Sequence, residues 1–471
     1  SEVSDHKDRK RVTMLFTCIT GPDLIEHLPS QSMGIELRLD LFPKIDIGYL
    51  KHLIETWNGP ILLTLRKASQ GGGFIGSEGE RQSLIQKLLS LVPCFFDLEY
   101  DMCPIFLHQT IEDHPHTKFI LSYHNFTSIE TDVESIYRYM QKYPAFTYKI
   151  SVLTPSTNDA LKMLLSIKKY PRASIICMGP NGSFARVLGP IMGNIVNYAS
   201  IDAAEQTAPG QLPFSDYMGI YRYGSINANT AIYGLIGDPI ENSRGHLYHN
   251  EAFAQRGVDA LYIKMVVTEE ELPEFFQLAR ALDIRGLSVT SPLKEKVLPF
   301  LDELDAHAEG SLAVNTIGFQ KGRMIGVNTD GIGALDAIEK QMYVRGKTVV
   351  VLGAGGAARA VAFEAHTRGA YVLILNRTLA KAKKLALDIG CKAGGLDEVP
   401  TSYDLLIQCS TDPMPIDPEK IQTGTWAMDL VYCPKETLFL QAACRKQCQI
   451  IYGQEMFLNQ AALQTSFWMA L

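Results

Sequence analysis

The stretch "FTYKISVL" at residues 146–153 is apolar and rich in aromatic and β-branched residues, as buried strands are, and only Lys149 interrupts it with a charge. A lysine is ordinary in a strand with one face in water. In a strand buried on both faces, its charge is costly unless the surroundings compensate it. The fold therefore depends on how this strand is covered.

Seven similar runs accompany this stretch between residues 12 and 202, and stretches of helical period such as "ERQSLIQKLLSLV" lie between them. They are "VTMLFTCI" (12–19), "GIELRLDL" (34–41), "PILLTLR" (60–66), "CFFDLEYD" (94–101), "KFILSYHNF" (118–126), "ASIICMGP" (173–180) and "YASID" (198–202). A strand and a helix, repeated eight times in about 200 residues, predict a (β/α)₈ barrel. Strands that are apolar on both faces favour a parallel sheet covered by helices, so Lys149 is expected to be buried.

Charged side chains follow a pattern within these runs. Glu36, Arg38 and Asp40 alternate and therefore share one face of their strand. Other charged or titratable residues fall late in their runs: Arg66, Asp97, Glu99, His124 and Lys149. Late positions of parallel barrel strands converge on the carboxyl-terminal rim, where barrel enzymes carry out their chemistry. The sequence thus predicts a polar pocket that contains Lys149.

A lysine in such a pocket could act as a nucleophile towards a ketone, which requires its neutral form. At pH 7 an unperturbed lysine is neutral in only about one molecule in 2,500. Burial and nearby arginines would lower its pKa, whereas Glu36 and Glu99 would raise it, so the net direction stays open. His124 is the natural proton shuttle because its pKa is closest to neutrality.

Each of these residues has a plainer interpretation when taken alone: Lys149 as a rim lysine paired with a carboxylate, and His124 as a hydrogen-bonded polar residue. Both together beside "ELRLD" favour an imine-forming lyase or aldolase.

Composition limits the class of protein. A chain of 471 residues predicts two or three domains, and 46% hydrophobic with 20% charged residues is typical of globular proteins. The net charge of −7 argues against nucleic-acid binding, and the absence of a run of 18 apolar residues argues against a membrane span. We expect small-molecule substrates as partners.

The cysteines and the first residues bear on location. Nine cysteines without a CxxC pair favour reduced thiols over disulfides or a zinc site, so no metal is expected. The polar stretch "SEVSDHKDRKRV" at residues 1–12 lacks the apolar segment of a secretory signal. We expect a cytoplasmic protein, or a plastid one if a transit peptide has been removed.

The second half of the chain shows a different organisation. The stretch "GIYRYGSINANTA" (219–231) resembles a linker, and new α/β patterns begin at "AIYGLIGDPI" and at "KTVVVLGAGGAARAVAFEA" (347–365). We expect a barrel at residues 1–222, a substrate-binding domain at 223–331 and a nucleotide-binding Rossmann domain at 332–454. The terminal helical run, residues 455–471, is expected to fold back onto the middle domain.

The string "GAGGAA" (353–358) fits the dinucleotide pattern G-x-G-x-x-A between a strand and a helix. The next strand ends in Asn376, Arg377 and Thr378 rather than in an acidic residue, which favours a 2′-phosphate and hence NADP(H) over NAD. An ordinary surface arginine is the alternative. The expected cofactor-binding residues are Gly353, Ala354, Gly355, Gly356, Ala357, Asn376, Arg377, Thr378, Ser410 and Gly453.

The middle domain contains "GLSVTSPLKEKV" (286–297) and "GVNTDGIGAL" (326–335). Lys294 and Asp330 could pair in a cleft, where the lysine would exchange a proton with a carbonyl oxygen as a hydride reaches its carbon. Taken singly, they would be a solvated helix lysine and a helix N-cap.

The motifs "ELRLD", "LTLR", "FFDLEYD", "SYHNF", "YKIS" and "TAPGQ" occur in the order seen in type I 3-dehydroquinate dehydratases, and the resemblance spans residues 12–215. It implies that Lys149 forms a Schiff base with the substrate, that His124 moves the proton and that Glu99 orients His124. The substrate-binding residues that it implies are Glu36, Arg38, Arg66, Arg186, Thr207 and Gln211. Gln70 departs from a common glutamate, and Thr207 from a usual serine.

Residues 232–471 resemble shikimate dehydrogenase through the motifs above together with "LAVNTI", "DLVYCPKET" and "YGQEMFLNQAA". The resemblance implies Lys294 and Asp330 as the catalytic pair. It implies the substrate ligands Ser243, Thr290, Asn315, Tyr432 and Gln460.

Two departures from that family are visible. "SRGH" (243–246) replaces "SxSP", so Gly245 stands where a second carboxylate-binding serine is usual, and we hypothesise that Arg244 or His246 takes over part of its role. "IQCSTDPM" (407–414) replaces the usual lining near the nicotinamide, although Ser410 and Thr411 still supply hydroxyls.

Together the two halves resemble bifunctional dehydroquinate dehydratase–shikimate dehydrogenases. The resemblance implies dehydration of 3-dehydroquinate followed by NADPH-dependent reduction to shikimate. The alternatives are a non-catalytic quinate-pathway regulator and a quinate/shikimate dehydrogenase-type fusion, such as an imine-forming aldolase joined to an NAD-linked quinate oxidoreductase.

Overall fold

The computed structural model describes residues 13–30, 33–127 and 132–471. The polar stretch 1–12, which includes the predicted first strand residue Val12, lies outside the described residues. The chain divides into two compact units, and the division falls between Thr230 and Ala231.

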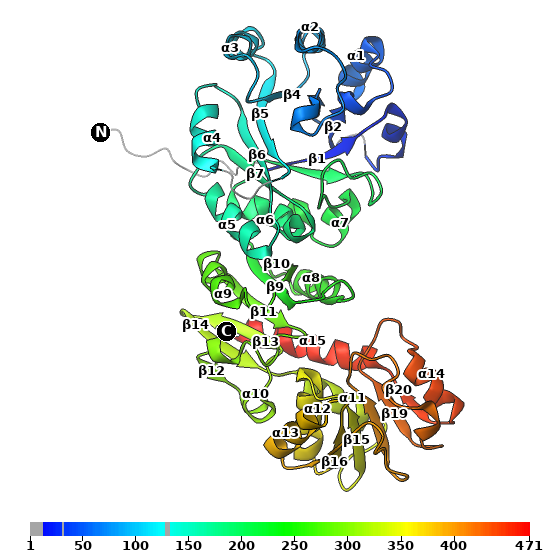
Figure 1. The fold of residues 1–471 in the computed structure, drawn as a ribbon. Coiled ribbons are helices and arrows are strands. Elements are labelled where there is room, and N and C mark those ends of the chain that lie inside the picture. Colours follow the sequence, from blue (N-terminus) through cyan, green and yellow to red (C-terminus); the bar gives the residue numbers. More distant parts are fainter. Residues whose placement is uncertain (1–12, 31–32, 128–131) are drawn as a thin grey trace. The chain divides into compact units, whose positions relative to one another are not determined.

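The first unit contains eight parallel strands in the order β7-β6-β5-β4-β3-β2-β1-β8 (Figure 1). They are β1 (Met14–Ile19), β2 (Gly34–Arg38), β3 (Ile61–Thr64), β4 (Phe95–Glu99), β5 (Lys118–Asn125), β6 (Thr147–Leu153), β7 (Ala173–Met178) and β8 (Val196–Ser200). This sheet is a nearly closed barrel, with β7 and β8 at the two ends of the hydrogen-bonded ladder. The predicted (β/α)₈ fold class is therefore confirmed.

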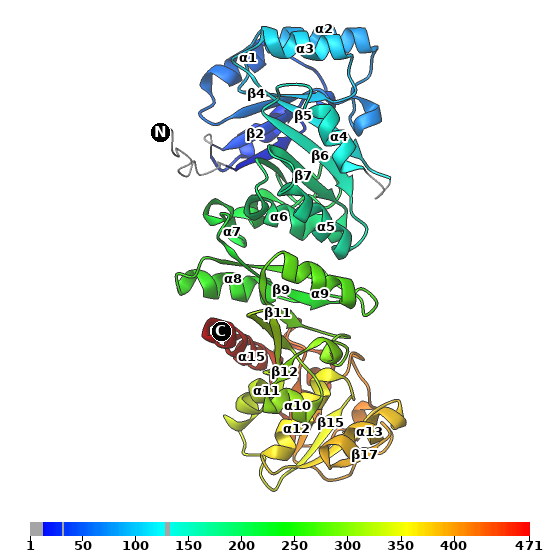
Figure 2. The same cartoon turned by 90° about the vertical axis from the view of Figure 1, so that its left-hand side faces the viewer.

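Helices surround these strands in both views (Figure 1, Figure 2). They are α1 (Ile47–Thr56), α2 (Glu78–Leu89), α3 (Pro104–Asp113), α4 (Val133–Met140), α5 (Thr157–Ile167), α6 (Ser183–Met192) and α7 (Phe214–Gly219). The start of α2 shows why its sequence forms a helix there: Ser77 Oγ accepts a hydrogen bond from Glu80 N–H, and the Glu80 carboxylate accepts one from Ser77 N–H. This capping box fixes the first turn of α2.

The barrel interior is apolar near the beginnings of the strands. Phe16, Leu62, Phe95 and Ile120 are at most 3% exposed and form one cluster, in which the Phe16 and Phe95 rings are 5.4 Å apart. Because this layer fills one end of the barrel, a site can form only towards the carboxyl ends of the strands.

The second unit contains two six-stranded sheets. The first has the order β10-β9-β11-β13-β14-β12, with β9 (Ala231–Gly237), β10 (Ala260–Val266), β11 (Ile284–Val289), β12 (Glu303–Leu304), β13 (Thr316–Gln320) and β14 (Arg323–Val327). The second is parallel and has the order β17-β16-β15-β18-β19-β20, with β15 (Thr348–Leu352), β16 (Tyr371–Leu375), β17 (Lys392–Gly394), β18 (Leu405–Gln408), β19 (Trp426–Asp429) and β20 (Gln449–Ile451). This order is that of doubly wound dinucleotide-binding sheets, as predicted.

The helices of this unit are α8 (Gly245–Gln255), α9 (Leu272–Ala281), α10 (Ala306–Ser311), α11 (Asp330–Glu339), α12 (Gly356–Thr367), α13 (Leu379–Ile389), α14 (Leu438–Arg445) and α15 (Gly453–Ala470). Helix α15 follows the second sheet in sequence but packs on the first (Figure 1, Figure 2). Gln464 Nε2 donates to the Asn315 carbonyl, and Trp468 Nε1 donates to the Ile317 carbonyl, each at 3.0 Å. Among the described residues, no helix is both long and apolar enough to cross a membrane.

Candidate active sites

A cavity at the carboxyl ends of the barrel strands gathers most of the residues expected from the sequence. It is lined by Glu36, Arg38, Arg66, His124, Lys149, Arg186, Thr207 and Gln211. Further lining residues, which the sequence interpretation did not assign to the site, are Cys18, Gly71, Phe126, Ser151, Ile176, Met178, Tyr198 and Ala208. Gln70, noted as a departure from the family, also lines it.

Lys149 lies deeper in the barrel than the sequence suggested. It is the third residue of β6, in register with Ser122 of β5 and Ser174 of β7, rather than at the strand end. Its side chain is 6% exposed, and its Nζ lies 3.9 Å from the centre of the Tyr198 ring. The long side chain thus brings the amine to the cavity from within the strand.

The surroundings settle the direction in which the pKa of Lys149 moves. Burial and then the neighbouring Arg66 lower it from its usual value to about 8, against Asp97 and Glu36, which raise it. With that pKa the amine is neutral in about one molecule in ten at pH 7. The nucleophilic form is therefore well populated near neutral pH.

His124, unlike most Lys149 amines, is neutral at pH 7. Burial and then Arg66, Lys149 and Arg38 lower its pKa well below the usual value. Its backbone N–H donates to Gln70 Oε1 at 2.9 Å, and its buried Nδ1 makes no hydrogen bond with another described residue. A neutral imidazole with an available nitrogen can accept a proton.

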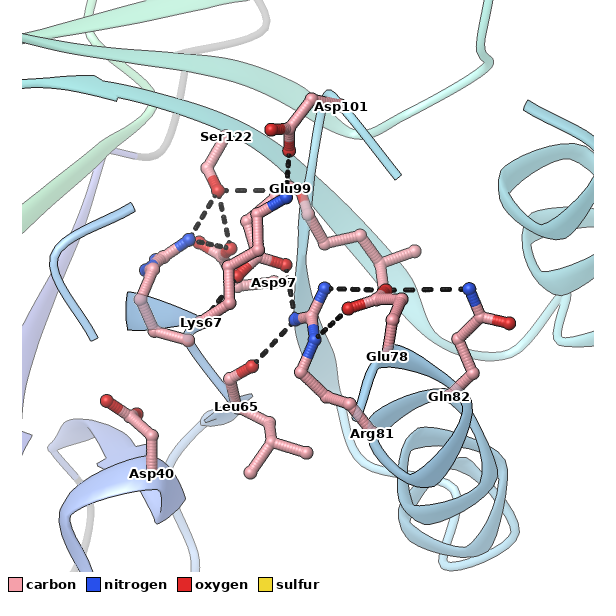
Figure 3. Close-up of polar contacts among 12 residues, drawn as sticks. Asp40, Leu65, Lys67, Glu78, Arg81, Gln82, Asp97, Glu99, Asp101 and Ser122 are labelled. Carbon is pink, nitrogen blue, oxygen red and sulfur yellow. Dashed lines mark hydrogen bonds and ion pairs between the residues drawn. The ribbon is translucent and has the colours of Figure 1, made fainter. Parts of the chain in front are cut away.

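Glu99 does not have the position that its expected role requires. It is absent from the cavity lining. Its Oε2 accepts from Arg81 Nη1 at 2.7 Å, and its Oε1 accepts from the Lys67 backbone N–H at 3.0 Å (Figure 3). Gln70 binds the His124 backbone N–H, and the Phe126 ring stacks on the imidazole with ring centres 6.0 Å apart. Glu99 looked suitable because it ends a strand beside that of His124, but both of its oxygens are bound to α2 and to the chain after β3.

Arg66 is held by partners on two neighbouring strands. Its Nη1 donates to Asp97 Oδ1 at 2.7 Å and to Ser122 Oγ at 2.6 Å. Burial alone would raise the pKa of Asp97, but Arg66 and Lys149 lower it below its usual value. The pair therefore stays charged, and the remaining guanidinium N–H groups are available to a ligand.

The other charged groups of the cavity are also fixed. Glu36 accepts from Cys18 Sγ at 2.9 Å and from Thr64 Oγ1 at 2.7 Å. Arg186 Nε donates to the Cys177 carbonyl at 3.0 Å, and Nη2 donates to the Pro209 carbonyl at 3.1 Å. Such preorganised donors and acceptors suit a small ligand that carries a carboxylate and hydroxyls.

A second cavity, of about 430 Å³, lies in the second unit and is lined from both of its sheets. Its size is that of a small-molecule site. The expected residues that line it are Ser243, Thr290, Lys294, Asn315, Asp330, Ala357, Ser410, Tyr432 and Gln460. Residues at this cavity that were not expected include His249, Tyr262, Ser288, Gln408, Cys409 and Gln464.

Lys294 and Asp330 are paired in this cavity. Lys294 Nζ lies 2.5 Å from Asp330 Oδ2, and Asn315 Nδ2 donates to Asp330 Oδ1 at 3.0 Å. Asp330 is the first residue of α11, where the helix dipole stabilises a carboxylate. The arrangement places an ammonium group where it can donate a proton to a bound carbonyl oxygen.

The glycine-rich turn after β15 joins the cofactor region to this lysine. Gly353 has φ +116°, a conformation that favours glycine. A Cβ at Gly356 would lie 2.6 Å from Lys294 Cβ, so helix α12 begins directly against the lysine. A Cβ at Gly355, the N-cap, would meet no atom within 4 Å. The open N-terminus of α12 therefore fits the pyrophosphate of a dinucleotide.

The other expected cofactor residues lie outside the second cavity. Asn376, Arg377 and Thr378 follow β16, and the last two are exposed. Gly353, Ala354, Gly355 and Gly356 form the turn at α12. Gly453 begins α15, where a Cβ would lie 2.6 Å from the Asp429 carbonyl oxygen, so this glycine allows a close approach of two backbone segments. An exposed arginine beside the end of β16 fits the 2′-phosphate of NADP(H).

The position of the missing serine is next to a tyrosine. A Cβ at Gly245 would lie 3.1 Å from Tyr262 Oη and 3.6 Å from Ser243 Oγ. Arg244 Nη2 donates to Cys433 Sγ at 3.3 Å, and neither Arg244 nor His246 lines the cavity. The hypothesis that Arg244 or His246 replaces the serine stays a prediction, since Arg244 contacts Tyr432 and Cys433, which do line the cavity.

Comparisons with known proteins agree with both halves. Residues 16–228 match the family model of type I 3-dehydroquinase, residues 235–317 that of the shikimate dehydrogenase substrate-binding domain, and residues 336–425 that of shikimate/quinate 5-dehydrogenase.

Relatives match along the whole chain. The "Shikimate biosynthesis protein AroDE" of Chlamydia pneumoniae is 37% identical over 97% of this chain and 95% of its own length. The chloroplastic "Bifunctional 3-dehydroquinate dehydratase/shikimate dehydrogenase" of Arabidopsis thaliana is 31% identical over 100% of this chain and 84% of its own. The "Shikimate dehydrogenase (NADP(+))" of Carboxydothermus hydrogenoformans is 41% identical over 52% of this chain and 93% of its own. The chain therefore belongs to the family of bifunctional proteins that join a type I 3-dehydroquinase to a shikimate dehydrogenase.

Proposed function

We propose that this chain catalyses two consecutive reactions, dehydration of 3-dehydroquinate to 3-dehydroshikimate in the barrel and reduction of that ketone to shikimate with NADPH in the second unit. The proposal depends on one observation: the buried Lys149, with a pKa of about 8, and the neutral His124 line the same cavity. Family membership makes this function preferable to a non-catalytic regulator, because the paired Lys294 and Asp330 are also in place.

In the dehydratase site, neutral Lys149 attacks the substrate ketone, and loss of water leaves an iminium ion. The iminium withdraws electrons and acidifies the adjacent carbon, from which His124 takes the proton. His124 then gives this proton to the departing hydroxyl group, which leaves as water, and a second water molecule hydrolyses the imine to release product and free amine.

The arginines orient the substrate in this scheme. Arg66 and Arg186 each donate some of their guanidinium hydrogen bonds to protein oxygens, and their other N–H groups can bind a ligand in the cavity. A guanidinium group binds a carboxylate with two parallel hydrogen bonds, which suits the substrate carboxylate. Glu36, Arg38, Thr207 and Gln211 would contact the hydroxyl groups.

In the second unit, NADPH supplies the hydride when bound. Gly353–Ala357 would hold its pyrophosphate, and Arg377 with Asn376 and Thr378 would hold the 2′-phosphate. Lys294 donates a proton to the carbonyl oxygen of the substrate, and Asp330 orients the ammonium group at 2.5 Å. Asn315 and Gln460 lie together in the cavity wall, with Asn315 Nδ2 3.4 Å from Gln460 Oε1. Both would hold the substrate beside the Lys294–Asp330 pair.

The substrate carboxylate would be bound by Ser243 and Tyr262. The Tyr262 hydroxyl borders the space that a serine at Gly245 would occupy. Loss of one hydrogen bond to a charged group should raise KM for shikimate about tenfold or more in Tyr262→Phe, with kcat little changed. The double variant Arg244→Ala/His246→Ala is the matched comparison, and an equal rise in KM there would refute the assignment to Tyr262.

A coupled assay tests the function as a whole. The chain is given 3-dehydroquinate and NADPH, and consumption of NADPH is followed. Turnover is expected with NADPH and not with NADH, whereas a regulator would give no turnover and a quinate oxidoreductase would prefer NAD. Borohydride reduction in the presence of substrate should label Lys149, and label on another lysine would contradict the Schiff-base assignment.

We propose a cytoplasmic or plastid location for the protein. The nine cysteines are free thiols, which fits a reducing compartment, and the Arabidopsis thaliana relative is named chloroplastic.

A further inference from the structure

A buried ion pair joins α2 to β4 (Figure 3), and neither of its residues lines the barrel cavity. Arg81 of α2 and Glu99 of β4 have side chains 1% and 2% exposed, and Arg81 Nη1 lies 2.7 Å from Glu99 Oε2. A buried ion pair contributes little net stability, because removing both charges from water offsets their attraction. Its contacts indicate a different role.

The pair holds the backbone on both sides of Arg66. Arg81 Nη1 donates to the Leu65 carbonyl at 3.0 Å, and Glu99 Oε1 accepts from the Lys67 N–H at 3.0 Å. The Arg66 carbonyl is fixed as well. It accepts from Phe74 N–H at 3.2 Å, and a Cβ at Gly72 would lie only 2.1 Å from its oxygen. The peptide groups around Arg66 therefore have little freedom to shift.

The position of Arg66 matters to Lys149. The groups that face this amine from the surrounding strands are Cys18, Glu36, Arg66, Asp97, His124 and Tyr198. Glu36 and Asp97 favour the protonated amine and His124 is neutral, so Arg66 is the cation that opposes protonation. Displacement of its guanidinium would leave the carboxylates in excess.

We propose that Arg81 and Glu99 are positioning residues for the dehydratase reaction, which fix the backbone at Leu65 and Lys67 and so keep the Arg66 guanidinium in the cavity, facing Lys149. The inference rests on the proposed dehydratase function. It assigns Glu99 a role that acts through Arg66 rather than through His124.

Glu78 provides a matched control. It accepts from Arg81 Nε at 2.9 Å and Nη2 at 3.0 Å, but its side chain is 47% exposed, and its hydrogen bonds go to Arg81 and Gln82 rather than to Leu65 or Lys67. Glu78→Gln therefore alters the outer side of Arg81 and leaves its inner contacts in place.

The test measures the pH dependence of the dehydratase reaction in the Arg81→Lys variant. A lysine at position 81 keeps the positive charge but cannot form the forked hydrogen bonds of a guanidinium group. The acidic limb of dehydratase kcat/KM should move up by roughly one pH unit, as for the loss of a neighbouring charge, and the rate at pH 7 should fall about tenfold. Reductase activity of the same chain should stay within about twofold, and Glu78→Gln should behave as the parent chain.

A double-variant cycle separates positioning from general stability. The pKa of Lys149 is measured by the pH dependence of its acetylation with acetic anhydride, which requires no turnover. Arg81→Lys should raise this pKa in the parent chain and should have no further effect in an Arg66→Met background. An unshifted pKa in the parent chain, or an equal shift in both backgrounds, would overturn the proposal.

If Arg81→Lys does not fold, Glu99→Gln carries the same test, because it is nearly isosteric and keeps an acceptor for Lys67. The expected rise in the pKa of Lys149 is then smaller, and no rise overturns the proposal. Failure of the proposed function itself would be seen separately, as a parent chain that neither turns over 3-dehydroquinate nor is labelled at Lys149.

Discussion

At Lys149 two opposing influences act on a single amine. Burial and Arg66 lower its pKa, Asp97 and Glu36 raise it, and the result is a value of about 8. The carboxylates are partly compensated by their own partners, Arg66 for Asp97 and Thr64 for Glu36. Burial therefore prevails, and the residue is poised for covalent chemistry at the expense of folding stability.

The first prediction concerns the pH dependence of dehydration. Because the neutral amine is the proposed nucleophile, kcat/KM should rise about tenfold per pH unit below pH 8 and level off above it. Initial rates of dehydration, measured between pH 6 and pH 10 without NADPH so that no reduction follows, would test this. An acidic limb near the usual lysine value would show that Lys149 is not perturbed in solution.

The second prediction is that replacing Lys149 removes dehydratase activity but stabilises the fold of the barrel. Folding lowers the pKa of Lys149, so protonation of this amine destabilises the folded chain. The destabilisation is complete below pH 8 and disappears above the pKa that the lysine has in the unfolded chain. Lys149→Met should therefore abolish dehydration while raising the free energy of unfolding of the barrel, by up to about 3 kcal/mol at pH 7.

Denaturant unfolding of the parent and Lys149→Met chains at several pH values checks this second prediction. The difference between the two chains should shrink as pH rises through 8 towards the unfolded pKa. A stability difference independent of pH would contradict it.

At the scale of elements, the N-terminus of α12 meets the side chain of Lys294. A Cβ added at Gly356 would lie 2.6 Å from Lys294 Cβ, so the expected cofactor turn packs directly against the proposed proton donor. Gly355, one residue earlier, faces open space instead. Two adjacent glycines of one motif thus serve different purposes.

The third prediction separates these two glycines. Gly356→Ala should displace Lys294 and lower reductase kcat about tenfold or more, because the neighbour to be moved carries the proton that is donated. Gly355→Ala should mainly raise KM for NADPH, because its methyl group enters the space left for the pyrophosphate. Steady-state kinetics of both variants decide the matter, and a pure KM effect in Gly356→Ala would contradict the packing argument.

At the scale of the whole molecule, each unit has cores of its own. The barrel cluster around Phe16 and Phe95 contains residues of the first unit alone, and the clusters around Val349, Leu406 and Tyr233 contain residues of the second unit alone. Each catalytic cavity is likewise lined from within one unit.

The fourth prediction follows from this division. A chain cut between Thr230 and Ala231 should give two pieces that fold separately, and residues 231–471 should keep reductase kcat within about twofold of the full chain. Assay of each purified piece measures this. Loss of reductase activity in a folded piece 231–471 would show that the barrel contributes to that site.

The order of apolar runs and of the glycine-rich turn carried enough local information to predict the barrel, the dinucleotide-type sheet and most of the cavity residues. Strand period and helix period are local properties, and parallel strands bring their ends together, so Arg66, His124 and Lys149 could be grouped without coordinates. Pairing of Lys294 with Asp330 was expected from two motifs that flank one cleft, and they lie 2.5 Å apart.

Other features depended on side chains from distant segments. Glu99 is bound by Arg81 of α2, Lys149 enters from the third position of β6, and Tyr262 borders Gly245. The contacts of Glu99 and Tyr262 join residues of different elements, and nothing in the local pattern around either residue indicates them. The sequence by itself thus determined the two folds and the chemical groups of each site. Only the tertiary structure decided which carboxylate meets which cation, and hence the charge state of the amine, because electrostatic energies depend on distances and burial that local periodicity does not contain.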